Sequence, residues 1–188
     1  MADPHDEAAL GWVAVTYGGL ADLLAADEDA WDAASLCEGW RVRHVVAHVT
    51  MPVRLTPESY GAEMAAAGGD FGVLSDTVAA RDATLPAADL LDQLRSPDLH
   101  AWQPPGGGAV GALTLAVVHS LDVTVALGRP PVAPPEAVSA VLDQLVVSGG
   151  AWFGVDPAGV QREGADPGSL VALLSGRTLP DGRSLPRA

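Results

Sequence analysis

Two short motifs carry the side chains in this sequence that could do chemistry. The stretch WRVRHVVAHVT places His44 and His48 four residues apart in an apolar run. On a helix this spacing puts both imidazoles on one face, where they could share a metal ion. A zinc protease with this spacing uses a glutamate after the first histidine as its base, and Val45 at that position argues against this class. The alternative is that one histidine packs inside and the other faces water.

The second motif is His119-Ser-Leu-Asp122, inside the apolar stretch LTLAVVHSLDVTVALG. A helix that is apolar on nearly every side is expected to be buried, and a buried polar group without a partner costs roughly 1–3 kcal/mol. His119 and Asp122 could satisfy each other, or Asp122 could meet a backbone group or a distant arginine. The functional alternative is that both face His48 across a helix bundle, where bundles commonly hold metals.

The elements that would position these motifs are mostly helical. Apolar residues recur at helical spacing in several segments, and Gly128 is placed to end one of them. We expect Pro52 to interrupt the second segment, because proline cannot donate to the helix ladder. The expected helices span residues 6–26, 42–64, 71–83, 86–95, 109–127, 136–147 and 166–175.

The pattern changes after these long helices. Residues 96–108 are expected to form a loop, and residues 151–164 two short extended pieces around a turn. The arginine-containing tail is expected to be loose. The predicted fold is therefore dominated by α structure: an antiparallel four-helix bundle in residues 1–150, followed by a small C-terminal α/β annex in residues 151–188.

Composition excludes several classes of function. The net charge is −14, and all ten basic residues are arginine. Such a chain is not expected to bind nucleic acid or anionic membranes, which require clustered positive charge. We expect no segment to approach the ~20 apolar residues of a membrane helix, and the acidic N-terminus does not resemble a secretory signal. The single cysteine, Cys37, fits a reducing cytoplasm.

Several of these segments together resemble a known family. CEGW, VRHVVAH, AWQPPGGG, ALTLAVVHSLDVTVALG and WFGVDPAGVQ follow one another in this order. They resemble motifs of the DinB-like superfamily and, more closely, of its mycothiol-dependent maleylpyruvate isomerase branch. The similarity extends over roughly residues 8 to 180. It implies a DinB-like four-helix bundle with a small-molecule site at one end.

The resemblance also implies a divalent metal, zinc or nickel, held by three ligands, together with a low-molecular-weight thiol. His48 and His119 match two of the ligands. The other ligand, a histidine or glutamate one turn before His119, is replaced by Leu115. His44 also departs from the family, which usually has aspartate there. Two histidines alone make a poor site, so His44 or Asp122 would have to supply a further ligand.

Other polar residues carry less information. Cys37 is expected to be structural rather than nucleophilic, because nothing near it in the sequence lowers its pKa. Arg54 and Arg81 could bind a carboxylate, although arginines are usually solvated at the surface. Gly106-Gly107-Gly108 precedes a helix and could cradle an anion, or could simply give a flexible loop. We expect Trp40 to anchor its turn to the core, and Tyr60 and Trp102 to line a pocket.

Three functions remain open from the sequence, and the small-molecule enzymes are favoured. The first is an isomerase or thiol transferase with a degraded metal site. The second is a metal-independent cyclase or isomerase in which His48, His119 and Asp122 form an acid–base set. The third is a non-catalytic small-molecule binding protein with a vestigial site. A homodimer is compatible with all three.

Overall fold

A computed structural model describes residues 4–148, 153–157, 160 and 165–188. These residues form ten α-helices and one 3-10 helix, η1 (Glu28–Asp32), and they contain no β-strand. The helices are α1 (Pro4–Ala25), α2 (Val42–Val49), α3 (Met51–Arg54), α4 (Pro57–Ala66), α5 (Phe71–Asp82), α6 (Ala87–Leu94), α7 (Pro97–Ala101), α8 (Gly108–Thr124), α9 (Pro135–Val147) and α10 (Pro167–Leu174).

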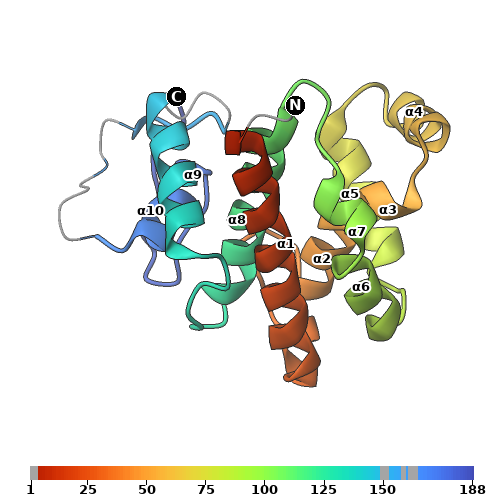
Figure 1. The fold of residues 1–188 in the computed structure, drawn as a ribbon, viewed down its shortest axis with the longest axis horizontal. Coiled ribbons are helices and arrows are strands. Elements are labelled where there is room, and N and C mark those ends of the chain that lie inside the picture. The colour runs from red at the N-terminus through yellow and green to blue at the C-terminus, as the bar shows by residue number, and fades with distance from the viewer. Residues whose placement is uncertain (1–3, 149–152, 158–159, 161–164) are drawn as a thin grey trace.

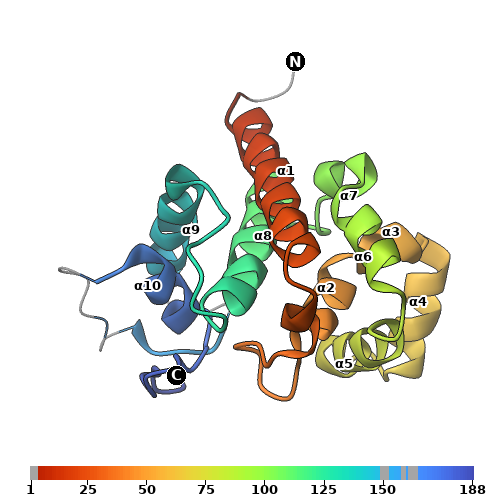
Figure 2. The ribbon, with the colours of Figure 1, turned by 90° about the horizontal axis from the view of Figure 1, so that it is seen from below.

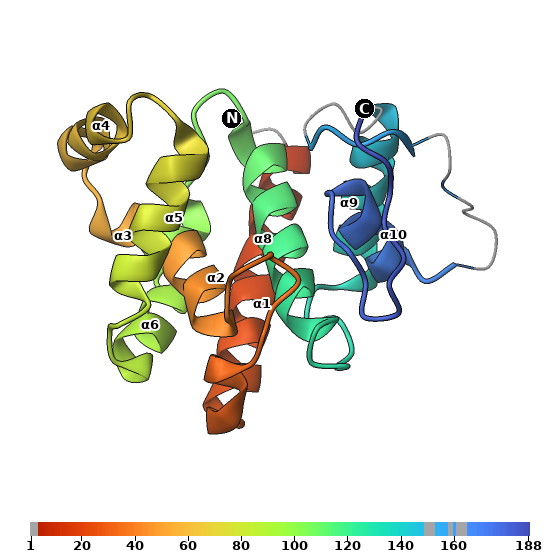
Figure 3. The ribbon, with the colours of Figure 1, turned by 180° about the vertical axis from the view of Figure 1, so that it is seen from behind.

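The helices α1 and α8 form the central pair of the molecule (Figure 1). The helices α9 and α10 pack on one side of this pair, and α2 to α7 lie on the other side (Figure 2). Seen from behind, α2 and α5 stand beside α8, and the loop that leads into α2 crosses in front of α8 (Figure 3). The prediction of a fold dominated by α-helices is thereby confirmed.

Burial of α8 explains why its sequence is apolar on every side. Fourteen of its seventeen residues are buried, since neighbouring helices cover it on several faces. Its Leu121 lies in the same core cluster as Leu20 and Leu24 of α1, all with 0% exposure. Each fully buried leucine contributes about 1.5–3 kcal/mol. His119 and Asp122 of α8 are therefore surrounded by packed core residues rather than by water.

Local signals set the helix boundaries. Asp70 and Asp166 cap α5 and α10 with side-chain oxygens that accept backbone N–H groups, as is typical of N-cap residues. The second predicted helix divides into three: α2 ends at Val49, and Pro52 lies in the first turn of the short α3. Pro52 thus interrupts the segment as expected, because its ring removes a backbone donor.

Two expectations from the sequence, a loop before α8 and a C-terminal annex, differ from the structure. Residues 97–101 form helix α7, in which Ser96 accepts from the backbone N–H of Asp98 and Pro97 occupies the first turn. The expected α/β annex is not supported either, although α10 forms where a short helix was predicted. The described part contains only an isolated bridge between Val155 and Arg187.

Backbone chemistry explains why that bridge does not extend into a ladder. Gly154 has a φ of +61°, outside the range of a strand, and Pro157 has no N–H to donate. Of the residues predicted to form the two extended pieces, 151–152, 158–159 and 161–164 lie outside the described residues. The division into two domains stays a prediction.

One described helix, residues His5–Ala25 of α1, is long and apolar enough to cross a membrane by length and composition. No such segment was expected from the sequence, and that expectation was wrong. Val13, Tyr17 and Leu20 of this helix are buried in the core against neighbouring helices. Core helices of globular proteins pass the same length and composition test.

Candidate functional site

The structure brings together two of the predicted side chains from distant parts of the chain. His48 lies near the end of α2 and His119 in α8, and their ring centroids are 4.9 Å apart in an edge-to-face arrangement. Each residue is only 9% exposed. The two imidazoles therefore share one buried position between helices.

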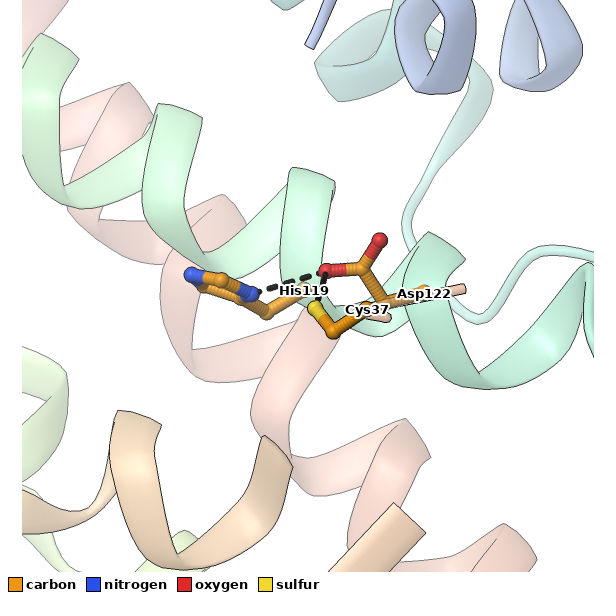
Figure 4. A group of neighbouring side chains, drawn as sticks. All are labelled: Cys37, His119 and Asp122. Atoms are coloured by element: carbon orange, nitrogen blue, oxygen red, sulfur yellow. Dashed lines mark hydrogen bonds and ion pairs between the residues drawn. The ribbon is translucent and has the colours of Figure 1, made fainter. Parts of the chain in front are cut away.

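Asp122 is the centre of a buried hydrogen-bond cluster one turn after His119. Its Oδ2 lies 2.9 Å from Nδ1 of His119 and accepts the thiol of Cys37 at 3.1 Å (Figure 4). Arg177 donates to both carboxylate oxygens, through Nε at 2.7 Å and through its second terminal nitrogen at 2.9 Å. The carboxylate is only 1% exposed, so these donors replace water completely.

This cluster fixes the charges of its members. Burial alone would raise the pKa of Asp122, but the hydrogen bonds from His119 and Arg177 outweigh it and hold that pKa below its usual value. The pKa of Arg177 is raised by Asp122, in spite of burial. Burial, reinforced by Asp122, raises the pKa of Cys37. Asp122 and Arg177 are therefore a stable ion pair, and Cys37 remains a neutral thiol.

His48 lies in a different environment. Its Nδ1 is 2.9 Å from the hydroxyl oxygen of Ser75 on α5, and its ring is 5.3 Å from the ring of Trp40 between centroids. Burial, reinforced by the neighbouring His119, lowers the pKa of His48 to about 3. His48 is therefore neutral at physiological pH, and one of its nitrogens is held by a hydroxyl.

Two pockets meet at the imidazole pair. The apolar chamber, of about 740 Å³, is lined mainly by side chains of α3, α4 and the loop before α8, among them Leu55, Tyr60 and Trp102. The polar chamber, of about 860 Å³, is lined by the loop before α2 and by the C-terminal tail, including Cys37 and Arg177. Both chambers are lined by His48, Phe71, Leu115 and His119. A molecule in either chamber can reach the imidazoles.

Other predicted residues lie elsewhere. Nδ1 of His44 accepts the backbone N–H of Arg41 at 3.2 Å, which places His44 in the first turn of α2 and away from the pair. Arg54 binds Asp82 at 2.9 Å and so links α3 to α5, whereas Arg81 binds Asp82 at 2.6 Å within α5 itself. The structure does not bring these three side chains to the chambers.

The glycine run before α8 serves packing. A Cβ on Gly107 or Gly111 would come within 2.9 Å of Cγ of Pro104, closer than real Cβ contacts allow. Gly106 has a φ of +77°, a left-handed conformation that favours glycine. These glycines let the loop of Pro104 fold tightly against α8, where it forms part of the wall of the apolar chamber.

Sequence reasoning missed Arg177 and Ser75 as members of the site. The tail that contains Arg177 was expected to be loose, whereas this side chain is bound to Asp122 and to the carbonyl of Ser175. One available signal was the buried Asp122 itself, for which a distant arginine was among the expected partners. Ser75 had no signal, because many helical serines simply face water.

The described chain is an all-helical bundle with a buried His/Asp cluster between two pockets. Residues 16–101 match the family model of the mycothiol maleylpyruvate isomerase N-terminal domain. This segment belongs to that family, which is part of the DinB-like superfamily. It contains His48 and Ser75, whereas His119, Asp122 and Arg177 lie beyond its end. No curated protein and no solved structure matches the chain.

DinB-like domains often bind a metal, and the donor atoms here can be tested for that role. Among the described residues, one group has candidate ligand atoms within 4.8 Å of one another: Cys37, His119 and Asp122. A divalent ion there would lie against the guanidinium of Arg177, which already binds both oxygens of Asp122. The alternative pair, His48 and His119, meets Leu115 where a further ligand would be needed. Neither set fits a resident divalent metal.

Proposed function

We propose that this protein is a small-molecule enzyme of the isomerase type that moves protons with its two imidazoles and needs no metal. One observation carries the proposal: His48 and His119 are in contact, and the Nδ1 of each has its own partner. The Nε2 atom of each ring is then available to a molecule in the chambers. The family match supports an enzyme on this fold.

His119 is the proposed general base. Asp122 is ionised and can only accept, so the hydrogen bond between them places the proton on Nδ1 of His119. Its Nε2, which points away from Asp122 (Figure 4), keeps a lone pair for a substrate proton. Asp122 orients the ring and stabilises the imidazolium that forms, as buried carboxylates do in acid–base pairs.

His48 is the proposed hydrogen-bond donor. It is neutral, and a hydroxyl proton from Ser75 on its Nδ1 would place the ring proton on Nε2. A neutral imidazole N–H can polarise a carbonyl oxygen without transferring its proton completely. His48 and His119 then differ in role because Ser75 and Asp122 differ in charge.

The reaction class follows from these two roles. Nε2 of His119 takes a proton from a carbon next to a carbonyl group, and the C–H electron pair becomes the C=C bond of an enolate. The carbonyl π pair moves to oxygen, where the N–H of His48 holds the charge. In a β,γ-unsaturated substrate the enolate is conjugated with the neighbouring C=C bond, and return of the same proton to the γ-carbon shifts that bond and re-forms the carbonyl group. The product is the conjugated isomer, so that atoms and electrons balance without an added reactant.

A metal- and thiol-dependent reaction is the second candidate, favoured by the family match and by the Cys37–His119–Asp122 group. In that case the polar chamber, which Cys37 and Arg177 line, would receive a low-molecular-weight thiol. The ion pair between Asp122 and Arg177 disfavours the metal that this candidate requires.

The family match also supports a cytoplasmic location.

The test uses 2-tetralone, an uncharged aromatic ketone, and follows exchange of its α-protons for deuterium by NMR. Wild-type protein should accelerate exchange, and His119→Ala should lose about 100-fold or more of that acceleration, the usual contribution of a positioned base. His44→Ala, at the other end of α2, is the matched control and should exchange like wild type. Equal exchange by His119→Ala and wild type would overturn the proposal.

A further inference from the structure

The apolar chamber has an unusual composition for a pocket in so acidic a protein. Its seventeen lining residues include no aspartate, glutamate or arginine, although the chain has a net charge of −14. Its ionisable groups are two tyrosines and the imidazole pair. Burial raises the pKa of Tyr17, and His48 is neutral at physiological pH. The part of the wall away from the imidazole pair therefore offers no cation to an anionic substrate.

This composition selects against charge. A carboxylate moved from water into such a chamber would lose its hydration without gaining a paired cation, which is strongly unfavourable. The arginine of the site, Arg177, lines the polar chamber and already donates hydrogen bonds to Asp122 and to the carbonyl of Ser175. The chamber thus differs from the site expected for a small organic anion.

The walls favour flat aromatic molecules. Tyr60, Phe71 and Trp102 offer ring surfaces from three separate segments, and Pro52, Pro57, Pro104 and Pro105 add rigid apolar surface. Aromatic pairs add about 0.5–1.5 kcal/mol each beyond the area that they bury. The volume of about 740 Å³ is in the range that encloses molecules of several rings. Phe71 is 49% exposed, so its ring lies at an accessible edge of the chamber.

We propose that the apolar chamber binds an uncharged, multi-ring aromatic molecule with a carbonyl or hydroxyl group directed at His48 and His119. This inference rests on the proposed function, because it names the substrate class of the same imidazole pair. The single polar end of the chamber sets the orientation of the molecule: its rings lie against Tyr60 and Trp102, and its oxygen lies at the N–H of His48.

The experiment compares two probes that differ in one charge, flavone and flavone-8-carboxylic acid, by calorimetric titration of the full chain. Wild-type protein should bind flavone at least about tenfold more tightly than the carboxylate. Leu55→Arg, which introduces a cation into the chamber wall, should reverse this preference. Tyr60→Lys introduces a cation from α4, a helix in which no residue is buried, and is the second variant to test if Leu55→Arg does not fold.

Controls separate this inference from the proposed function. Ser184→Trp, which fills the polar chamber at an exposed position, should leave flavone binding within about threefold of wild type. His119→Ala should keep the preference for flavone, since it adds no cation to the chamber wall. Equal binding of both probes by wild type, or no binding of flavone, would overturn the substrate class. Unchanged proton exchange in His119→Ala would instead overturn the proposed function alone.

Discussion

Removing the cation of the Asp122–Arg177 pair should destabilise the fold more than removal of any surface arginine. In Arg177→Met the methionine keeps apolar bulk but leaves a carboxylate that is 1% exposed without its two guanidinium donors. The side chain of Arg177 is itself only 18% exposed, so water cannot replace it readily. Breaking a buried pair costs about 3–5 kcal/mol. We expect the lower end, about 3 kcal/mol, because His119 and Cys37 still bind Asp122.

The measurement is urea unfolding at pH 7, followed by far-UV circular dichroism. Arg129→Met is the matched control, because Arg129 pairs with Asp27 at the surface with 56% of its side chain exposed. Such a pair contributes about 0.2–1 kcal/mol. The double variant Asp122→Asn/Arg177→Met removes both charges and should recover about half of the loss. A loss for Arg177→Met no greater than for Arg129→Met would refute the assignment of a buried ion pair.

Three further predictions concern His48, Ser75 and Leu115. The pKa of His48 is about 3 in the folded chain, below the unfolded value, so its contribution to stability is full at high pH and falls as pH drops below ~6.5. The free energy of unfolding in urea should therefore decrease by about 2 kcal/mol between pH 7 and pH 5 in wild type, and by less in His48→Gln. Ser75→Ala removes the hydroxyl that orients His48 and should slow tetralone exchange about tenfold at unchanged flavone affinity; an unchanged exchange rate would contradict that role. Leu115→His places a third imidazole at the pair and should bind zinc stoichiometrically by calorimetry, whereas wild type should not; equal binding by both would contradict the ligand argument.

The sequence was sufficient for most helices because their boundaries depend on local chemistry. Apolar periodicity located α1, α5 and α9, and Pro52 marked the break after α2. The missed helix α7 had its own signal, an N-cap serine followed by proline at Ser96-Pro97, which the nearby glycines and prolines outweighed. The predicted α/β annex is not supported, because apolar alternation did not account for backbone limits at Gly154.

The site was less accessible from local pattern. The meeting of His48 with His119 was inferred by analogy with bundle proteins and from a family resemblance, since no local pattern relates positions so far apart. The partner of Asp122 lies 55 residues further along the chain, and only burial and charge balance could have indicated that it is an arginine. The role of Ser75 depends on how α5 packs beside α2, which no periodicity specifies.

The most direct test of the account is the dependence of proton exchange on metal. Protein treated with a chelator and dialysed should exchange the α-protons of 2-tetralone at the untreated rate, and added zinc or nickel should not increase it. Loss of exchange after chelation, restored by stoichiometric zinc or nickel, would contradict a site that works through two imidazoles alone.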